Sequence, residues 1–182
     1  MHPVVHRLLR GLLLGVVTLG EAFAQQAAES SVKAALVYKF ASYVEWPAES
    51  FTSPEMPLAI CMVGAEEVAA DLEPLVRGRT VNNRTIVVRR LKEGDAIGGC
   101  HVVYVGRRDA PRLPNIAKAA RPQSALVVSD AERGLENGSV INFVAVEDRI
   151  GFEVSIDAAE RSNLRISSRM LTVARRVVPR AS

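Results

Sequence analysis

Short apolar runs of strand length alternate with helical patterns along most of this chain, and this alternation limits the folds that it can adopt. Four such runs, bounded by glycine, proline or polar residues, predict buried strands at 58–64, 85–91, 101–106 and 125–130. The intervening segments predict a helix over 65–76, with acidic residues in its first turn, and another over 109–120, opened by Asp109. Strands that alternate with helices predict an α/β layer fold with a largely parallel sheet.

The last part of the chain departs from this alternation. Two strand patterns at 140–146 and 150–156 flank a polar turn at 147–149, and together they predict an antiparallel hairpin. We expect a short helix capped by Asp157 to follow. An amphipathic helix over 166–178 is then expected to close the chain.

These patterns organise the chain into a single domain over 30–178, preceded by a short segment 25–29 and followed by a tail 179–182. Its expected fold is a mixed, largely parallel sheet flanked by helices, with the antiparallel hairpin near the C-terminus. The domain begins with a predicted helix over 30–46, which Pro47 ends. Aromatic side chains recur at helical spacing in this helix and are expected in the core, namely Tyr38, Phe40, Tyr43 and Trp46.

The first 24 residues have the anatomy of a secretory signal peptide. Arg7 and Arg10 provide a positive start, 11–20 is uncharged, and Ala22-Phe23-Ala24 supplies the small residues of a cleavage site. The apolar stretch is too short to span a bilayer, and a buried apolar helix is the alternative interpretation. We expect cleavage after Ala24 and export of a soluble chain. Loss of Arg7, Arg10 and Glu21 lowers the formal net charge from +3 to +2, a balance that does not favour a nucleic-acid partner.

Export determines the interpretation of the two cysteines, Cys61 and Cys100. In an oxidising compartment an even pair of cysteines is most simply a disulfide, and two buried free thiols are the alternative. A bridge between them would close a loop of 39 residues. In the chain-entropy treatment such a closure stabilises the folded state by about 4 kcal/mol.

Residues suited to catalysis are few in this sequence. Ligands of parallel sheets bind at the carboxyl ends of strands, which makes Gly64-Ala65, 106–109 and Ser129-Asp130 the candidate loops. None of these loops carries a nucleotide-binding glycine motif. Gly106-Arg107-Arg108 is compatible with an anion site, and a solvated loop is the alternative.

After cleavage His101 is the single remaining histidine. The sequence therefore predicts neither a histidine-rich metal site nor an elbow-type Ser-His-Asp triad. We expect a binding protein with no catalytic residue, no metal and no cofactor. An enzyme that uses His101 is the weaker alternative.

Several segments, in this order, resemble the YfiR family over about residues 30–177. The more specific ones are Val44-Glu45-Trp46-Pro47, at the end of the first helix, and the Leu164-x-Ile166-Ser167-Ser168-x-x-Leu171 block. The resemblance extends through the segments 33–47, 58–64, 98–106, 125–130, 138–144 and 152–175.

The resemblance implies a periplasmic repressor that binds the periplasmic domain of a YfiN-like inner-membrane diguanylate cyclase and holds it inactive. A YfiB-like, OmpA-type outer-membrane lipoprotein would relieve repression by sequestering the repressor, and the output would be cyclic di-GMP, exopolysaccharide and biofilm. The resemblance also implies a homodimer, and a Cys61–Cys100 bridge that matches a family disulfide. The alternative is a periplasmic small-ligand-binding or sensory-input module for another membrane receptor.

The predicted final helix supplies the candidate binding residues, because arginine is enriched at protein interfaces. In the alternative interpretation the apolar side of this helix packs on the sheet and its arginines face water. The candidates for contact with a partner or a small anion are Arg165, Ser167, Ser168, Arg169 and Arg175.

Overall fold

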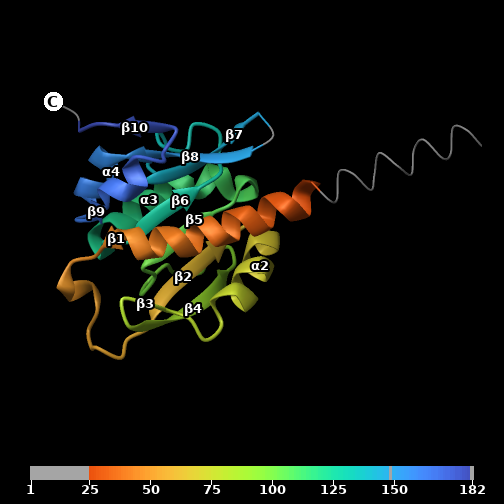
Figure 1. Cartoon of the computed structure of the whole chain (residues 1–182). Helices are drawn as coiled ribbons and strands as arrows, with labels where there is room; N and C mark the ends of the chain where they lie inside the picture. The colour runs from red at the N-terminus through yellow and green to blue at the C-terminus, as the bar shows by residue number, and fades with distance from the viewer. Residues whose placement is uncertain (1–24, 148, 181–182) are drawn as a thin grey trace, which may run out of the picture.

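The structure is a computed structural model that describes residues 25–147 and 149–180 (Figure 1). The predicted signal peptide 1–24 and its cleavage site lie outside the described residues, as do Asp148 and the last two residues of the predicted tail. An eight-stranded sheet forms the centre of the described chain, with helices on both of its faces. This arrangement confirms the predicted fold class.

The sheet is mostly parallel, with strand order β10-β8-β7-β6-β5-β2-β4-β3. The five adjacent strands from β4 to β7 run parallel, and β8 returns antiparallel beside β7 as the predicted hairpin. The strand bounds are β2 Leu58–Val63, β3 Thr80–Val81, β4 Arg84–Leu91, β5 Val102–Val105, β6 Leu126–Ser129, β7 Ile141–Val146, β8 Arg149–Ser155 and β10 Arg176–Val178.

Side chains of the central strands point alternately into two cores, one on each face of the sheet. Ile60, Met62 and Tyr104 face the larger core, whereas Cys61 and Val103 face the smaller one. All residues of β2, β5 and β6 are buried, which explains why these strands appear in the sequence as uninterrupted apolar runs.

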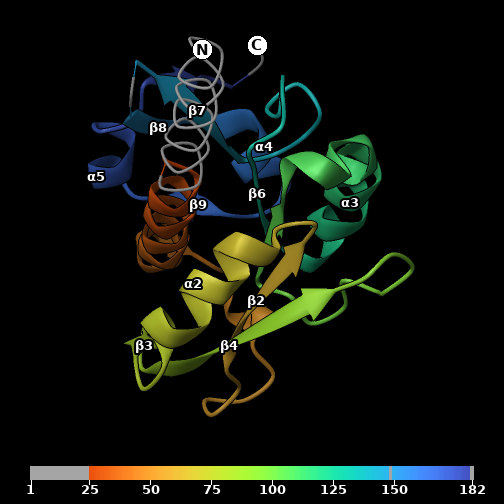
Figure 2. The same ribbon diagram turned by 90° about the vertical axis from the view of Figure 1, so that its right-hand side faces the viewer.

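The N-terminal helix and α2 cover the larger core, and α3 covers the smaller one on the opposite face (Figure 2). Phe40 of the N-terminal helix anchors this layer, since its ring lies 5.6 Å from that of Phe143 and 4.9 Å from that of Phe152. The helices are 25–43, α2 Glu66–Val76, α3 Leu113–Ala120, α4 Ile156–Arg161 and α5 Ser168–Leu171, with 3-10 turns η1 Ala48–Ser50, η2 Arg107–Arg112 and η3 Arg121–Gln123.

The first predicted helix, 30–46, has different bounds in the structure. Its described part begins at residue 25, so 25–29 is helical, and it ends at residue 43. The next two residues form β1, Val44–Glu45, which pairs antiparallel with β9, Arg165–Ile166. A strand partner more than 100 residues away in the chain thus takes over the backbone groups that a longer helix would have bonded.

The predicted final helix over 166–178 is wrong. The helical part is only α5, and the chain then extends into β10, which pairs parallel with β8. The Arg175 backbone N–H donates to the Phe152 carbonyl at 2.9 Å, and Arg176 forms two contacts of 2.9 and 2.8 Å with the Glu153 carboxylate. Valine-rich sequence at the C-terminus suits a strand once β8 offers an edge.

Two further helix starts differ from the prediction. The Ser155 hydroxyl, not Asp157, caps α4 by accepting from the Ala158 backbone N–H at 3.1 Å. Asp157 instead pairs with Arg161, one turn along the same helix. In the segment predicted as helix 109–120, the 3-10 turn η2 occupies residues up to 112 and the α-helix begins at Leu113.

Both edge strands of the sheet are short. At one edge, β3 has two residues and pairs antiparallel with β4. At the other, β10 has three residues and pairs with β8. β3 covers only Arg84 and Thr85 of β4, so within the described chain the rest of β4 has a strand partner on one side only.

Candidate functional site

The candidate binding residues lie on several elements rather than on one helix face. Arg165 lies on β9 opposite Glu45, and Ser167 immediately precedes α5, where its backbone N–H donates to the Tyr43 carbonyl at 2.9 Å. Ser168 and Arg169 form the first turn of α5. These four residues therefore share one segment beside the end of the N-terminal helix. Arg175 lies apart from them, next to Gly151 of β8.

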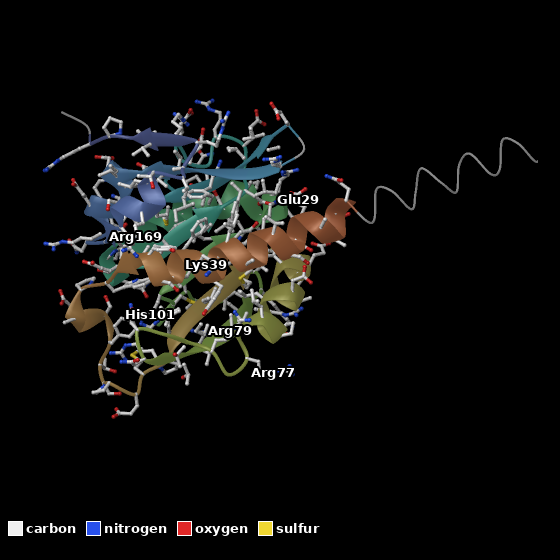
Figure 3. The ribbon with its side chains drawn as sticks, viewed as in Figure 1. Glu29, Lys39, Arg77, Arg79, His101 and Arg169 are labelled. Atoms are coloured by element: carbon white, nitrogen blue, oxygen red, sulfur yellow. A yellow bond between two sulfur atoms is a disulfide. The ribbon has the colours of Figure 1, made fainter. Side chains whose placement is uncertain are left out.

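The fold adds further exposed cations to the surface that carries Arg169. Lys39 lies on the N-terminal helix, and Arg77 and Arg79 follow α2, so that all four appear on the face shown in Figure 3. The Arg79 guanidinium lies 5.4 Å from the centre of the Tyr38 ring. None of the four forms an ion pair with a carboxylate within 25–147 or 149–180. We call Lys39, Arg77, Arg79 and Arg169 the basic face.

Sequence reasoning missed three residues of the basic face, Lys39, Arg77 and Arg79. They are scattered over a helix and a turn, and no local pattern distinguishes them from ordinary surface cations. Packing of α2 beside the N-terminal helix brings them together, as the contact between Arg79 and Tyr38 illustrates. Tertiary packing brings these cations together, so the spacing of residues in the sequence could not have revealed them.

The predicted disulfide between Cys61 and Cys100 is confirmed. Cys61 lies within β2, Cys100 lies two residues before β5, and their Cα atoms are 5.8 Å apart. Both side chains are buried, with residue exposures of 0% and 3%. The bond therefore fastens the start of β5 to the neighbouring β2 inside the smaller core.

His101, next to the disulfide, has both ring nitrogens engaged by the backbone. The Ala59 N–H donates to Nδ1 at 3.1 Å, so Nε2 carries the proton and donates to the Ser50 carbonyl at 3.0 Å. Phe51 stacks on the ring at 4.3 Å between centres. Burial, followed by the nearby charge of Arg84, lowers the pKa of His101 below 6.5, although the bond to Ser50 acts in the opposite direction. This neutral histidine holds the segment after the N-terminal helix against the sheet and has no ring nitrogen left for a substrate.

The three candidate ligand loops converge at the carboxyl edge of the parallel strands. Gly64-Ala65 follows β2, Gly106-Arg107 follows β5, and Asp130 follows β6, and all border one cavity of about 580 Å³. The first two loops are in close contact, because a Cβ placed on Gly106 would lie 2.2 Å from the Gly64 carbonyl oxygen. Glycine at position 106 is therefore required for the edge to close in this form.

Metal binding and membrane insertion are two further functions on which the described chain bears. Residues 25–147 and 149–180 contain no cluster of three or more His, Cys, Asp or Glu side chains suited to a metal ion. Within the same ranges, none of the helices combines the length and the apolar character needed to cross a bilayer.

Comparison with known proteins matches nearly all of the described domain. A family model described as YfiR/HmsC-like matches residues 30–175. Among solved structures, the crystal structure of a conserved domain protein from Vibrio cholerae O1 biovar El Tor is similar, with a TM-score of 0.50 and 14% sequence identity. The match covers 71% of this chain and 57% of that one, so this chain spans little more than half of its length. At this identity the likeness concerns the fold.

Proposed function

Since the chain belongs to the YfiR/HmsC-like family, we propose that it binds the periplasmic domain of a YfiN-like inner-membrane diguanylate cyclase and holds the cyclase inactive. At the level of the family, the protein is a periplasmic regulator of cyclic di-GMP signalling. Repression of the cyclase would lower cyclic di-GMP and, with it, exopolysaccharide and biofilm. The match over residues 30–175 is the observation that carries this proposal.

Repression of this kind is a population shift. A repressor that binds the inactive conformation of the cyclase more tightly than the active one can shift the equilibrium between them by at most the ratio of its two affinities. Turning a cyclase that is about 99% active into one that is about 99% inactive requires a preference of about 10⁴-fold. A YfiB-like lipoprotein of the OmpA type would reverse the shift by lowering the concentration of free repressor. A homodimer of this chain would carry two copies of the binding surface.

The basic face is our proposed contact surface for the cyclase. Its four cations are exposed and lack carboxylate partners within the described residues, so they are available to an acidic surface. Arg169 belongs to this face, and Arg165, Ser167 and Ser168 flank it on the same segment. Complementary charge accelerates association and fixes orientation, which suits a repressor that must find a membrane-bound partner. Arg175 lies outside the basic face.

Binding of the mature chain, from Gln25 onwards, to the purified periplasmic domain of a YfiN-like cyclase tests the proposal. We expect Lys39→Glu with Arg169→Glu to weaken binding at least tenfold, and to raise cellular cyclic di-GMP toward the level of a deletion strain. Lys118→Glu with Arg121→Glu is the matched control, because both are exposed cations of the α3 layer on the opposite face of the sheet.

The possible results distinguish a wrong contact surface from a wrong function. If the double charge reversal binds as tightly as the wild type, the basic face is not the contact surface. If the wild-type chain binds no such cyclase, and its deletion leaves cyclic di-GMP unchanged, the proposed function itself is wrong.

The disulfide connects this function to the redox state of the periplasm. If the Cys61–Cys100 bond maintains the supply of folded repressor, changing both cysteines to serine should raise cyclic di-GMP. Repressor abundance must be measured beside it, by immunoblot. An unchanged cyclic di-GMP level at unchanged abundance would reject this link.

A further inference from the structure

The cavity at the carboxyl edge lies where the order of the parallel strands reverses. After β2 the chain adds β4 on one side of that strand and then returns to add β5 on its other side. The loop after β2 leads to α2 on one face of the sheet, whereas the loop after β5 leads to α3 on the other. Crevices at such reversal points are where open α/β sheets bind their ligands. A volume of about 580 Å³ suits a small metabolite.

A buried lysine and two partly exposed carboxylates form one end of this cavity. Lys33 of the N-terminal helix is only 4% exposed, and its Nζ lies 2.6 Å from Asp130 Oδ2 and 2.5 Å from Glu29 Oε1. Glu29 lies near the start of the described helix in Figure 3. Two carboxylates thus surround one ammonium group, and this end of the cavity carries one net negative charge. We call Glu29, Lys33 and Asp130 the inner group.

Two buried polar atoms of the cavity lining lack a hydrogen bond of good geometry within the described chain, although the Tyr104 hydroxyl lies close to the Asp130 carboxylate. The hydroxyl of Tyr104, a residue with 0% exposure, is one, and Asp130 Oδ1 is the other. Both residues line the cavity. Burial first, and then the Asp130 carboxylate, raises the pKa of Tyr104 far above 10, so its hydroxyl remains protonated. Native proteins rarely leave such groups unbonded, and these two are positioned to bind a polar ligand.

The exposed part of the cavity lining, which we call the rim, has the reverse charge, and its Arg107 approaches the inner group at Asp130. Arg107 and Arg108 lie there with Glu67, and the Arg108 Nη2 atom lies 3.6 Å from Glu67 Oε1. Arg107 forms no ion pair with a carboxylate within 25–147 or 149–180; its Nε lies 3.5 Å from the Asp130 backbone carbonyl. Two guanidinium groups against one carboxylate leave one net positive charge at the rim, and in a chain that begins at Gln25 the α-amino group of that residue adds another positive charge to the lining. The first turn of α2 also begins here at Ala65, which has no capping side chain.

We propose that this cavity binds a small zwitterion, an α-ammonium carboxylate such as a free amino acid or a short peptide. The ligand's ammonium group would bind Asp130 Oδ1 and the Tyr104 hydroxyl, and its carboxylate would bind Arg107 at the rim. A ligand with only anionic groups would meet the two inner carboxylates, and a polycation would meet the two arginines at the rim. A ligand with one cationic and one anionic group matches both the net negative charge of the inner group and the net positive charge of the rim. This inference does not depend on the proposed cyclase partner.

Titration calorimetry of the mature wild-type chain with separate probes tests the ligand class. We expect L-alanine, L-leucine or the dipeptide L-alanyl-L-leucine to bind, and n-butylamine and butyrate, which each carry one of the two charges, to bind at least tenfold more weakly. If the free amino acids bind more tightly than the dipeptide, the ligand is a free amino acid. If the dipeptide binds more tightly, the ligand is a short peptide. If none of the three zwitterions binds at 10 mM, or if butyrate or inorganic phosphate binds as tightly as they do, the proposal is overturned.

Two substitutions test the placement of the ligand. Tyr104→Phe removes a hydroxyl without a hydrogen bond of good geometry, so we expect unchanged or higher thermal stability together with at least fivefold weaker zwitterion binding. Arg107→Gln should weaken zwitterion binding about tenfold and leave that of n-butylamine unchanged. Tyr43→Phe, a half-buried tyrosine outside the cavity, is the matched control. Wild-type affinity in both cavity variants would overturn the assignment. Asp130 is not varied, because its loss would leave the buried Lys33 with one partner fewer.

Discussion

The disulfide makes the strongest quantitative prediction, because the loop that it closes is long and both of its cysteines are buried in the core. Replacing Cys61 and Cys100 together by alanine removes the cross-link without placing a hydroxyl in a buried site. The two cysteines are separated by 39 residues. Loop closure of this length restricts the unfolded chain by about 13 cal/mol/K, which corresponds to about 4 kcal/mol at 25 °C.

Urea unfolding of the mature chain, followed by circular dichroism, measures this loss. With a dependence on urea of about 2 kcal/mol per molar, a loss of about 4 kcal/mol lowers the unfolding midpoint by about 2 M. Wild-type protein kept in a reducing agent provides a second measurement, because it lacks the bond but retains both sulfur atoms. The difference between oxidised and reduced wild type isolates the cross-link. The difference between reduced wild type and the double alanine variant isolates the packing of the sulfurs.

The chain-entropy argument fails under one clear outcome. If thiol titration shows two free thiols in the reduced wild type, and its midpoint lies within about 0.5 M of the oxidised one, the bond contributes only about 1 kcal/mol or less. The cysteines would then act through packing alone. The proposal that redox state controls the supply of folded protein would then lose its physical basis.

Three other predictions concern single side chains. Because burial lowers the pKa of His101 below 6.5, the unfolded state binds the proton first, so the free energy of unfolding should fall as pH falls through the window below 6.5. His101→Gln should flatten that slope in urea titrations, and a slope equal to that of the wild type would show that another group is responsible. Phe40→Ala should cost about 3–5 kcal/mol, since its ring contacts two other buried phenylalanines; a midpoint shift worth under about 1 kcal/mol would refute this core position. Ser155→Ala should cost about 1 kcal/mol and Asp157→Ala less, when both are compared by thermal unfolding, and the opposite order would restore Asp157 as the cap of α4.

The centre of the fold could be predicted from the sequence because burial on both faces leaves a strong local signal. β2, β5 and β6 are buried at every position, and each therefore appears as an apolar run between polar boundaries. The hairpin of β7 and β8 was equally predictable, since its strands are neighbours in sequence and a turn joins them. The location of the cavity followed from the same argument, because parallel strands place their carboxyl ends together.

The C-terminal segment could not be predicted, because its structure depends on partners far away in the chain. Val177 suits a helix by spacing, yet β8 offers it an open edge that sequence periodicity does not reveal. Ile166 similarly pairs with Val44, far away in sequence. Candidate residues chosen as one helix face were consequently divided among several elements.

The inner group of the cavity could not be predicted from the sequence either, because it too is formed by residues far apart in the chain. Lys33 falls within an amphipathic helix, where a lysine normally indicates a solvated position, and it pairs with Asp130, 97 residues away. The interpretation of 106–109 as a solvated loop or an anion site considered only local charge. The charged groups of the inner group and of the rim come together only when the N-terminal helix is packed across the strand ends.

The edges of the sheet restrict where another protein can add a strand to this one. An extended peptide can join a sheet only where a strand presents a row of free backbone groups, and β3 and β10 offer two and three residues. β3 pairs only with Arg84 and Thr85, so within the described chain residues 86–91 of β4 have a strand partner on one side only, which is β2. Strand addition would therefore have to use the open side of β4, and substitutions there should alter it far more than substitutions in β3 or β10.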